Sequence, residues 1–266
     1  MELNIRRAVR VSRHLLRASI TTQMQYRVDF LIQLGMALFW SVWHVLPLWL
    51  VFQLRETIAG FRFEEAALVL SAFLILKSVL EGLVNPNMIA VVDHVRRGTL
   101  DFVLLKPVDS QLLVSVSRVL PSKLVDFTWG IGLGIWALRQ LDPMPAPAAI
   151  AAGLSMLLTA VALLYALWLL VICTAFWFVR IDNLAFLFAS IFDAGRWPIS
   201  VFRGWIRAVL TFVLPVALMT SYPALAALGR LDAKAAAGAV ALAVGFLILS
   251  RVTWRWALGH YSSASS

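Results

Sequence analysis

Charged residues are scarce in this sequence. They make up 14% of its 266 residues, whereas hydrophobic residues make up 61%. A soluble domain usually carries about 25% charged residues, so the composition excludes an ordinary soluble protein. The apolar residues gather in blocks, several of them near or above the ~18-residue length of a spanning helix. Because these blocks do not alternate polar and apolar residues, as the strands of a membrane barrel do, they predict an all-α membrane protein.

The sequence also lacks the signatures of common active sites. It contains no phosphate-binding loop of the form G-x-x-x-x-G-K-[ST], and neither H-E-x-x-H nor G-x-S-x-G occurs. Cys173 is the single cysteine, which excludes an intrachain disulfide. The four histidines lie far apart on different predicted elements, so they suggest no metal site and no nucleophile–base pair. We therefore expect this chain to contribute no catalytic residue, to bind no metal or cofactor, and to be unable to hydrolyse a nucleotide by itself.

The segment 1–27 has an amphipathic, basic pattern. Between residues 3 and 20 one helical face is apolar and the other carries Arg6, Arg10, Arg13 and Arg17. A helix of this kind lies in the headgroup region of an anionic leaflet, although the solvated arm of a soluble helix would show the same pattern. Because the segment has no apolar core of signal-peptide length, we expect no cleavable signal peptide.

Six membrane spans are predicted after this segment. The ranges of five of them are about 28–52, 66–91, 124–138, 148–179 and 235–257. The remaining helix precedes the last span and begins with the apolar block 184–192. Residues 196–228 alternate short apolar runs with prolines, which predicts a broken or re-entrant hairpin before the last span. Non-helical backbone at membrane depth must be buried in protein or line a cavity.

The whole chain, 1–266, is predicted to form a single transmembrane domain. The first two spans occupy 28–92, a polar loop follows at 93–123, the remaining spans and the hairpin occupy 124–258, and 259–266 is a polar tail. Six spans place both termini on one side, which would carry 14 basic residues against 8 on the other. The positive-inside rule then predicts cytoplasmic termini. The net charge of +9 is explained by this distribution, so we expect no nucleic-acid partner.

The polar loop 93–123 contains the most informative motif. Gly98 can end one short helix and Thr99 can cap the next. Leu100, Val103 and Leu104 would then form an apolar patch. A rigid helix offered to a cytoplasmic partner and an amphipathic linker tucked against the membrane both fit this pattern.

Two pairs of charged residues fall within or beside apolar blocks. Lys77 and Glu81 are four residues apart, and Asp193 and Arg196 are three apart, so each pair shares a helix face. Charges at membrane depth are costly and usually face the interior of a bundle. Structural ion pairs are the favoured interpretation of both, with a role in a translocation path as the alternative.

Three stretches resemble bacterial permease subunits of ABC-2-type transporters. They are R-R-G-T-L-D-F-V-L-L-K-P-V at 96–108, Y-R-V-D-F at 26–30, and R-W-P-I-S-V-F at 196–202 with its continuation to residue 224. The resemblance covers nearly the whole chain in order and spacing. It implies six spans, an interfacial N-terminal helix, and a hairpin of short helices on the outer side before the last span.

The resemblance also implies a function. The chain would be the permease subunit of an exporter in the bacterial inner membrane, paired with a second copy or a homologous permease, and surrounded by membrane lipid. ABC ATPase subunits, which would bind the ATP and magnesium, would dock on the first cytoplasmic loop. The residues that would fall in the ATPase-facing region are Arg97, Gly98, Leu100, Asp101, Leu104, Lys106 and Pro107. The alternatives are an ATPase-independent secondary transporter or channel, and a structural membrane protein that recruits partners through the same loop.

Overall fold

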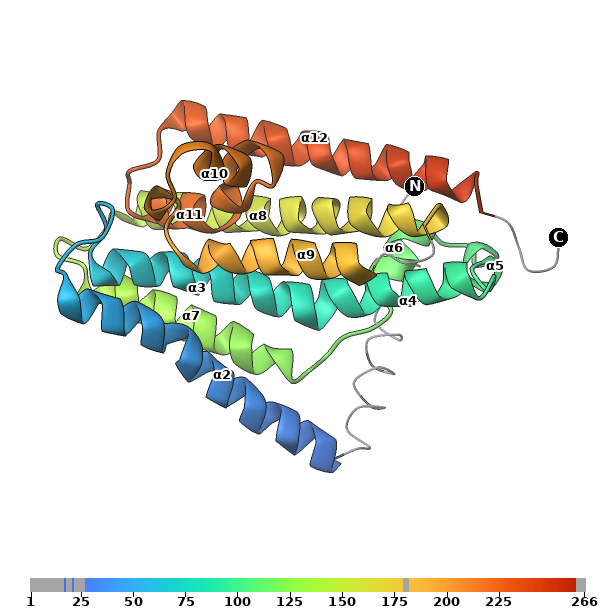
Figure 1. Cartoon of the computed structure of the whole chain (residues 1–266), viewed down its shortest axis with the longest axis horizontal. Coiled ribbons are helices and arrows are strands. Elements are labelled where there is room, and N and C mark those ends of the chain that lie inside the picture. The colour runs from blue at the N-terminus through green and yellow to red at the C-terminus, as the bar shows by residue number, and fades with distance from the viewer. Residues whose placement is uncertain (1–16, 18–20, 22–26, 179–181, 262–266) are drawn as a thin grey trace.

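The protein is a bundle of helices that lie roughly along one common direction (Figure 1). The computed structural model describes residues 17, 21, 27–178 and 182–261. Most of the segment 1–27, with the predicted interfacial helix at 3–20, lies outside these residues, as do 180–181 of the predicted tight connection. Within the described part of the chain the regular elements are all helical, which confirms the predicted all-α class.

In the part of the chain that the structure describes, four helices are long and apolar enough to cross a membrane. The first, α2, covers Arg27–Leu54, and the second joins α3 (Phe63–Val79), the π-helix η1 (Leu80–Val84) and α4 (Asn85–Arg96). The third joins α8 (Pro147–Cys173) to the 3-10 turn η2 (Thr174–Phe176), and the last is α12 (Ala233–Leu258). Each begins and ends close to a predicted span, so the chain is a multi-pass membrane protein.

The two other predicted spans correspond to helices that are weaker candidates. The helix α7 (Lys123–Gln140) has 18 residues, but these include the charged residues Lys123, Asp126 and Arg139. The helix α9 (Asp182–Phe192) has only 11 residues, about 16 Å at 1.5 Å per residue, which is too short to span. A count of six spans therefore stays a prediction.

A broken region connects α9 to α12. It contains the 3-10 turns η3 (Asp193–Arg196) and η4 (Ile199–Val201), then α10 (Gly204–Ala208), the π-helix η5 (Val209–Val213) and α11 (Val216–Ala227). The helical segments 204–211 and 216–227 are bent by 85° against each other, and if they count as one broken span the described residues contain five candidate spans. The interruption falls at Pro215, which cannot continue a helix because it lacks a backbone N–H.

The centre of the bundle is α3. In the continuous helix formed by α3, η1 and α4, 78% of the apolar stretch is buried. Close approach of helices depends on glycine: a Cβ on Gly130 of α7 would lie 2.9 Å from Ile75 Cγ1 of α3. Between α8 and α11, a Cβ on Gly153 would lie 2.6 Å from Ala227 Cβ. In contrast, α2 and α12 lie at opposite edges of the bundle, and only 17% of each apolar stretch is buried within the chain (Figure 1).

The two ends of the bundle differ in structure. One end carries α5 (Asp101–Leu104) and α6 (Ser110–Ser115), and we call it the α5 end (Figure 1). The opposite end, near the start of α3, holds Glu65, which is 5% exposed and accepts hydrogen bonds from the Arg62 backbone N–H at 3.0 Å and from Arg230 Nη1 at 3.1 Å. The α11–α12 connection is thereby tied to the start of α3.

Candidate functional site

A cavity of about 720 Å³ lies between α2 and the helices α3, η1, α7 and η3. Its lining contains three basic and three acidic residues, which are Lys77, Lys123, Arg196, Glu81, Asp126 and Asp193. We call it the charged cavity. It brings together all four intramembrane residues that the sequence singled out, and it merges the two predicted ion pairs into one network.

Lys77 is the link between α3 and η3. Its Nζ lies 2.8 Å from Asp193 Oδ1 and 3.8 Å from Glu81 Oε1. Lys77 and Glu81 thus lie within ion-pair distance, but the closer carboxylate, that of Asp193, belongs to a segment 116 residues away. The predicted Asp193–Arg196 pair is also present, with Arg196 Nη2 at 3.5 Å from Asp193 Oδ2 and Arg196 Nε donating to the Asp193 backbone oxygen at 2.9 Å.

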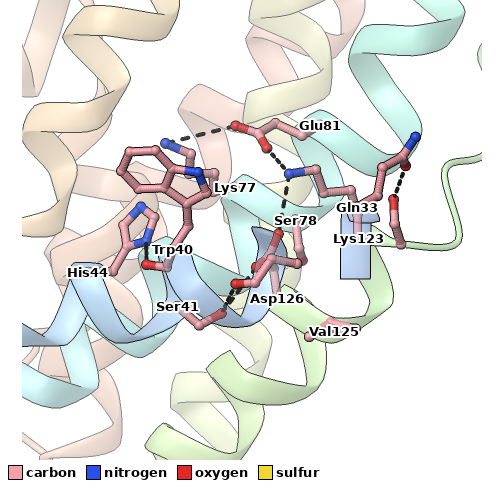
Figure 2. A network of polar contacts seen from close by, with 12 residues as sticks. Gln33, Trp40, Ser41, His44, Lys77, Ser78, Glu81, Lys123, Val125 and Asp126 are labelled. Carbon is pink, nitrogen blue, oxygen red and sulfur yellow. Dashed lines mark hydrogen bonds and ion pairs between the residues drawn. The ribbon is translucent and has the colours of Figure 1, made fainter. Parts of the chain in front are cut away.

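A second chain of contacts leads from Glu81 to α2 (Figure 2). Glu81 Oε2 lies 2.6 Å from Lys123 Nζ, which is also 3.3 Å from Asp126 Oδ2. The hydroxyl of Ser41 donates to Asp126 Oδ1 at 3.2 Å and thus connects α2 to the network. Positive and negative groups alternate along the whole series, so its formal charge sums to zero.

The π-helix η1 explains why Glu81 meets Lys123. A π turn interrupts the regular i→i−4 hydrogen bonds of a helix, and Pro86, four residues after Gly82, has no N–H to donate to the Gly82 carbonyl. Here the carbonyl oxygen of Gly82 accepts a hydrogen bond from the backbone N–H of Leu120 at 2.8 Å. That bond holds the chain just before α7 against η1. Gly82 is required at this contact because a Cβ would lie 2.9 Å from Lys123 Cβ.

The charged cavity lies toward the α5 end of the membrane region. Lys77 and Glu81 follow Phe63 by 14 and 18 residues, or about 21 and 27 Å along the helix. If Phe63 lies at one boundary of a hydrocarbon core about 30 Å thick, both groups fall in the far half of that core. Their side chains are 22% and 35% exposed, so they face the cavity rather than a fully packed interior.

Aromatic groups complete the wall of the cavity. Trp40, Trp43 and His44 line it. Behind the lining, the buried Phe73 ring has its centroid 5.5 Å from Lys77 Nζ and 5.9 Å from Arg196 Cζ, within the range of cation–π attraction. His44 Nδ1 lies 2.6 Å from the Trp40 carbonyl oxygen, and since a carbonyl only accepts, Nδ1 carries a proton. The wall therefore combines a charge-balanced polar strip with apolar and aromatic surface.

This arrangement favours binding over catalysis. Alternating charges at membrane depth can hold a polar or charged group that lipid would exclude. Among the described residues, no cluster of three or more His, Cys, Asp or Glu side chains could hold a metal ion. Cys173 is buried in α8 and does not line the cavity.

The second candidate site is the loop 93–123 at the α5 end. Gly98 ends α4 as predicted: its φ is +64°, its N–H donates to Val95 O at 3.2 Å, and the Thr99 N–H donates to His94 O at 2.9 Å. This is the Schellman pattern, which favours glycine at the left-handed position. The prediction that Thr99 caps the next helix was wrong. The N-cap of α5 is Leu100, and the Thr99 hydroxyl instead lies 2.9 Å from His94 Nδ1.

The apolar face predicted for α5 points into the protein. Leu100 is fully buried, Val103 is 9% exposed, and Leu104 is 37% exposed. The Leu100 N–H also donates to the Tyr261 hydroxyl at 3.1 Å. The surface of this turn is instead apolar through two residues that the sequence analysis did not single out, Phe102 (71% exposed) and Leu105 (80% exposed).

The remaining residues of the predicted docking set surround this turn. Arg97, Lys106 and Pro107 are exposed, whereas Gly98 and Asp101 are half-buried. The structure thus places six members of the set at least partly at the surface of the α5 end, and Leu100 beneath it.

The loop is clamped to two long helices. Asp109 is paired with both Nη atoms of Arg251 on α12, and Arg251 Nη1 also donates to Gln111 Oε1 at 2.8 Å. Tyr165 of α8 accepts a hydrogen bond from Gln111 Nε2 at 3.1 Å and lies 2.7 Å from Ser115 Oγ. The hydrogen bonds from the Arg251 guanidinium hold the pKa of the Asp109 carboxyl below its usual range. The loop therefore moves with α8 and α12 unless these bonds break.

Sequence reasoning missed the α7 and α2 members of the charged cavity. Lys123 was assigned to the polar loop, and Asp126 and Ser41 were not singled out. One signal was available for Lys123 and Asp126, because their three-residue spacing is that of a helical ion pair. Nothing in the sequence pairs Ser41 with Asp126, 85 residues away.

Comparison with known proteins identifies the family. A family model described as ABC-2 family transporter protein matches residues 38–265. No curated protein and no solved structure matches the chain. The match covers most of the sequence, so the chain belongs to the ABC-2 transporter family, as the resemblance of its motifs predicted.

Proposed function

We propose that this member of the ABC-2 transporter family is the permease subunit of an ATP-driven exporter, coupled to separate ATPase subunits that bind the ATP and magnesium. The observation that carries the proposal is the family match over residues 38–265. The chain would sit in a bacterial inner membrane with both termini in the cytoplasm. This topology requires six spans. The four long helices supply four of them, α7 would be another, and α9 with the bent α10–α11 region would be the sixth.

The α5 end would be the docking surface for the ATPase. Phe102 and Leu105 are exposed on a short turn whose other face is packed onto the bundle. An apolar pair with a rigid base suits a partner contact, because binding then orders few additional groups. The clamp from Asp109 and Gln111 to Arg251 would transmit a movement of this turn to α12.

A second permease would complete the translocation path. The apolar stretches of α2 and α12 are each only 17% buried within the chain, so lipid or another subunit must cover them. The charged cavity is bordered by α2, so a second copy placed against α2 would lie beside it.

An ATPase-independent secondary transporter is the second candidate. Such proteins carry ionisable residues on several membrane segments. The charged cavity supports this candidate more than the sequence did, because it gathers six charged residues from α3, η1, α7 and η3. The family match, together with the mutual neutralisation of these six groups, favours the ATP-driven exporter.

A pull-down separates the two candidates. The tagged chain would be purified gently from its native membrane, and co-purifying proteins would be identified by mass spectrometry. We expect a soluble ABC ATPase to be recovered, and its recovery to fall about tenfold or more in the variant Phe102→Asp/Leu105→Asp. Leu100→Asp is a poor test, because this side chain is buried and the change would disturb the fold.

Met144→Asp provides the matched control. Met144 is an exposed apolar residue, 61% accessible, in the connection between α7 and α8 at the opposite end of the bundle. The Met144→Asp variant should retain the ATPase at the wild-type level. Recovery of the chain without any ATPase, under conditions that preserve a known transporter complex, would refute the proposal and favour the secondary transporter.

A further inference from the structure

A separate pocket of about 200 Å³ lies at the α5 end, between α4, α5 and α6. Its floor is apolar and includes Ala90, Val91, Leu113 and Val114. Two positively charged residues, Lys106 and Arg118, and the imidazole of His94 also line it, and no acidic residue appears among its lining residues, all of which are described. The charged cavity has balanced charge, whereas this pocket does not.

The backbone around the pocket is firmly held. Asn87 is fully buried, and its Nδ2 donates to the carbonyl oxygens of Leu83 and Arg118 at 2.6 Å each. Its Oδ1 accepts from the Arg118 N–H at 2.7 Å. These bonds fix the backbone of Arg118 on α4, so its side chain is anchored at the pocket although it is itself exposed. Among the described residues, no carboxylate forms an ion pair with Lys106 or Arg118.

The level of the pocket matches the phosphate layer of a membrane. Asn87 and His94 follow Phe63 by 24 and 31 residues, or about 36 and 46 Å along the helix. If Phe63 lies at one boundary of a hydrocarbon core about 30 Å thick, the pocket begins just beyond the opposite boundary, where the headgroups lie. A helix tilt of about 20° shortens these depths by only a few ångströms.

We propose that this pocket binds the phosphate headgroup of an anionic phospholipid. The phosphate lies between Arg118, Lys106 and His94, and the first part of the lipid's apolar chain covers the apolar floor. Basic pockets between membrane helices are suited to anionic headgroups, and an apolar floor favours a lipid over free phosphate. A bound lipid would brace α5 against α4, and its binding does not depend on the presence of an ATPase.

Native mass spectrometry of the purified full-length chain in detergent tests this site. The chain would be titrated with palmitoyl-oleoyl phosphatidylglycerol and, separately, with phosphatidylcholine of the same acyl chains. We expect one phosphatidylglycerol to be retained in preference to phosphatidylcholine. The variant Lys106→Gln/Arg118→Gln should bind it about 25-fold more weakly, from about fivefold for each charge near the surface.

The control variant is Arg139→Gln/Lys234→Gln, which removes two exposed basic residues at the opposite end of the bundle. It should bind phosphatidylglycerol as the wild type does. Lys106→Arg/Arg118→Lys keeps both charges and should also bind, which separates loss of charge from loss of fold.

Three results would overturn the proposal. Equal retention of the two lipids would show that charge does not select the ligand. Wild-type binding by Lys106→Gln/Arg118→Gln would place the lipid elsewhere. Competition by millimolar glycerol phosphate or inorganic phosphate as strong as that by the lipid would identify a free-phosphate site instead. None of these results bears on the ATPase pull-down, so the two proposals fail separately.

Discussion

Replacing Lys123 by methionine tests the charge-balanced network most directly. Lys123 Nζ contacts two carboxylates, Glu81 at 2.6 Å and Asp126 at 3.3 Å, and the three side chains are between 18% and 35% exposed. Breaking an exposed ion pair costs about 0–1 kcal/mol, whereas leaving one partner of a buried pair alone costs about 3–5 kcal/mol. Because the exposure of these side chains lies between these two cases and they face a cavity, we expect Lys123→Met to lower the free energy of unfolding by about 2 kcal/mol.

A second substitution distinguishes charge imbalance from lost packing. Glu81→Gln in the Lys123→Met background removes one of the two carboxylates left behind and restores a net charge of zero. We therefore expect the double variant to be about 1 kcal/mol more stable than Lys123→Met alone. Such non-additivity is typical of residues in direct contact.

The measurement is a detergent-denaturation curve followed by circular dichroism, with Arg139→Gln as the control. Arg139 is exposed near the end of α7, and its replacement should change stability by less than about 0.5 kcal/mol. The reasoning is refuted if Lys123→Met behaves like this control, or if the losses caused by Lys123→Met and Glu81→Gln simply add.

Two further predictions concern packing and pH. Gly153→Ala should lower the free energy of unfolding by about 1–3 kcal/mol, since the new Cβ would lie 2.6 Å from Ala227 Cβ, while Gly132→Ala, where nothing lies within 4 Å, should cost nothing in the same denaturation assay. Arg251→Gln should cost about 0–1 kcal/mol, because Asp109 is 44% exposed. The folded-state pKa of Asp109 is lowered, so this difference should be present above the ordinary carboxyl pKa of about 3.9 and should disappear as the pH falls below it. A difference between wild type and Arg251→Gln that persisted or grew on acidification would contradict this account.

The long helices could be predicted because their signal is local. An apolar block of sufficient length predicts a membrane helix wherever it lies in the chain. The predicted spans 28–52 and 235–257 correspond to α2 and α12 within a few residues. The helical ion pair of Lys77 and Glu81 was predictable for the same reason, because residues four apart always share a helix face.

The composition of the site could not be predicted because its contacts are long-range. Asp193 reaches Lys77 across 116 residues, and that contact depends on where the broken region after α9 returns to α3. The backbone N–H of the buried Leu100 donates to the hydroxyl of Tyr261, 161 residues further along the chain. Gly82 and Pro86 indicate an interruption near the π turn at Leu80–Val84, because Pro86 has no N–H to donate along the helix. The segment that fills the interruption, at Leu120, could not be predicted from sequence periodicity.

The way the network crosses helix boundaries constrains any transport cycle. Lys77–Asp193 joins α3 to η3, Glu81–Lys123 joins η1 to α7, and Ser41–Asp126 joins α7 to α2. Widening the charged cavity by moving one of these elements would therefore separate opposite charges, or a carboxylate from its donor, in the membrane. That separation is unfavourable unless water or a polar cargo replaces the lost partner. The network therefore opposes any widening of the charged cavity that leaves these charges without a polar partner.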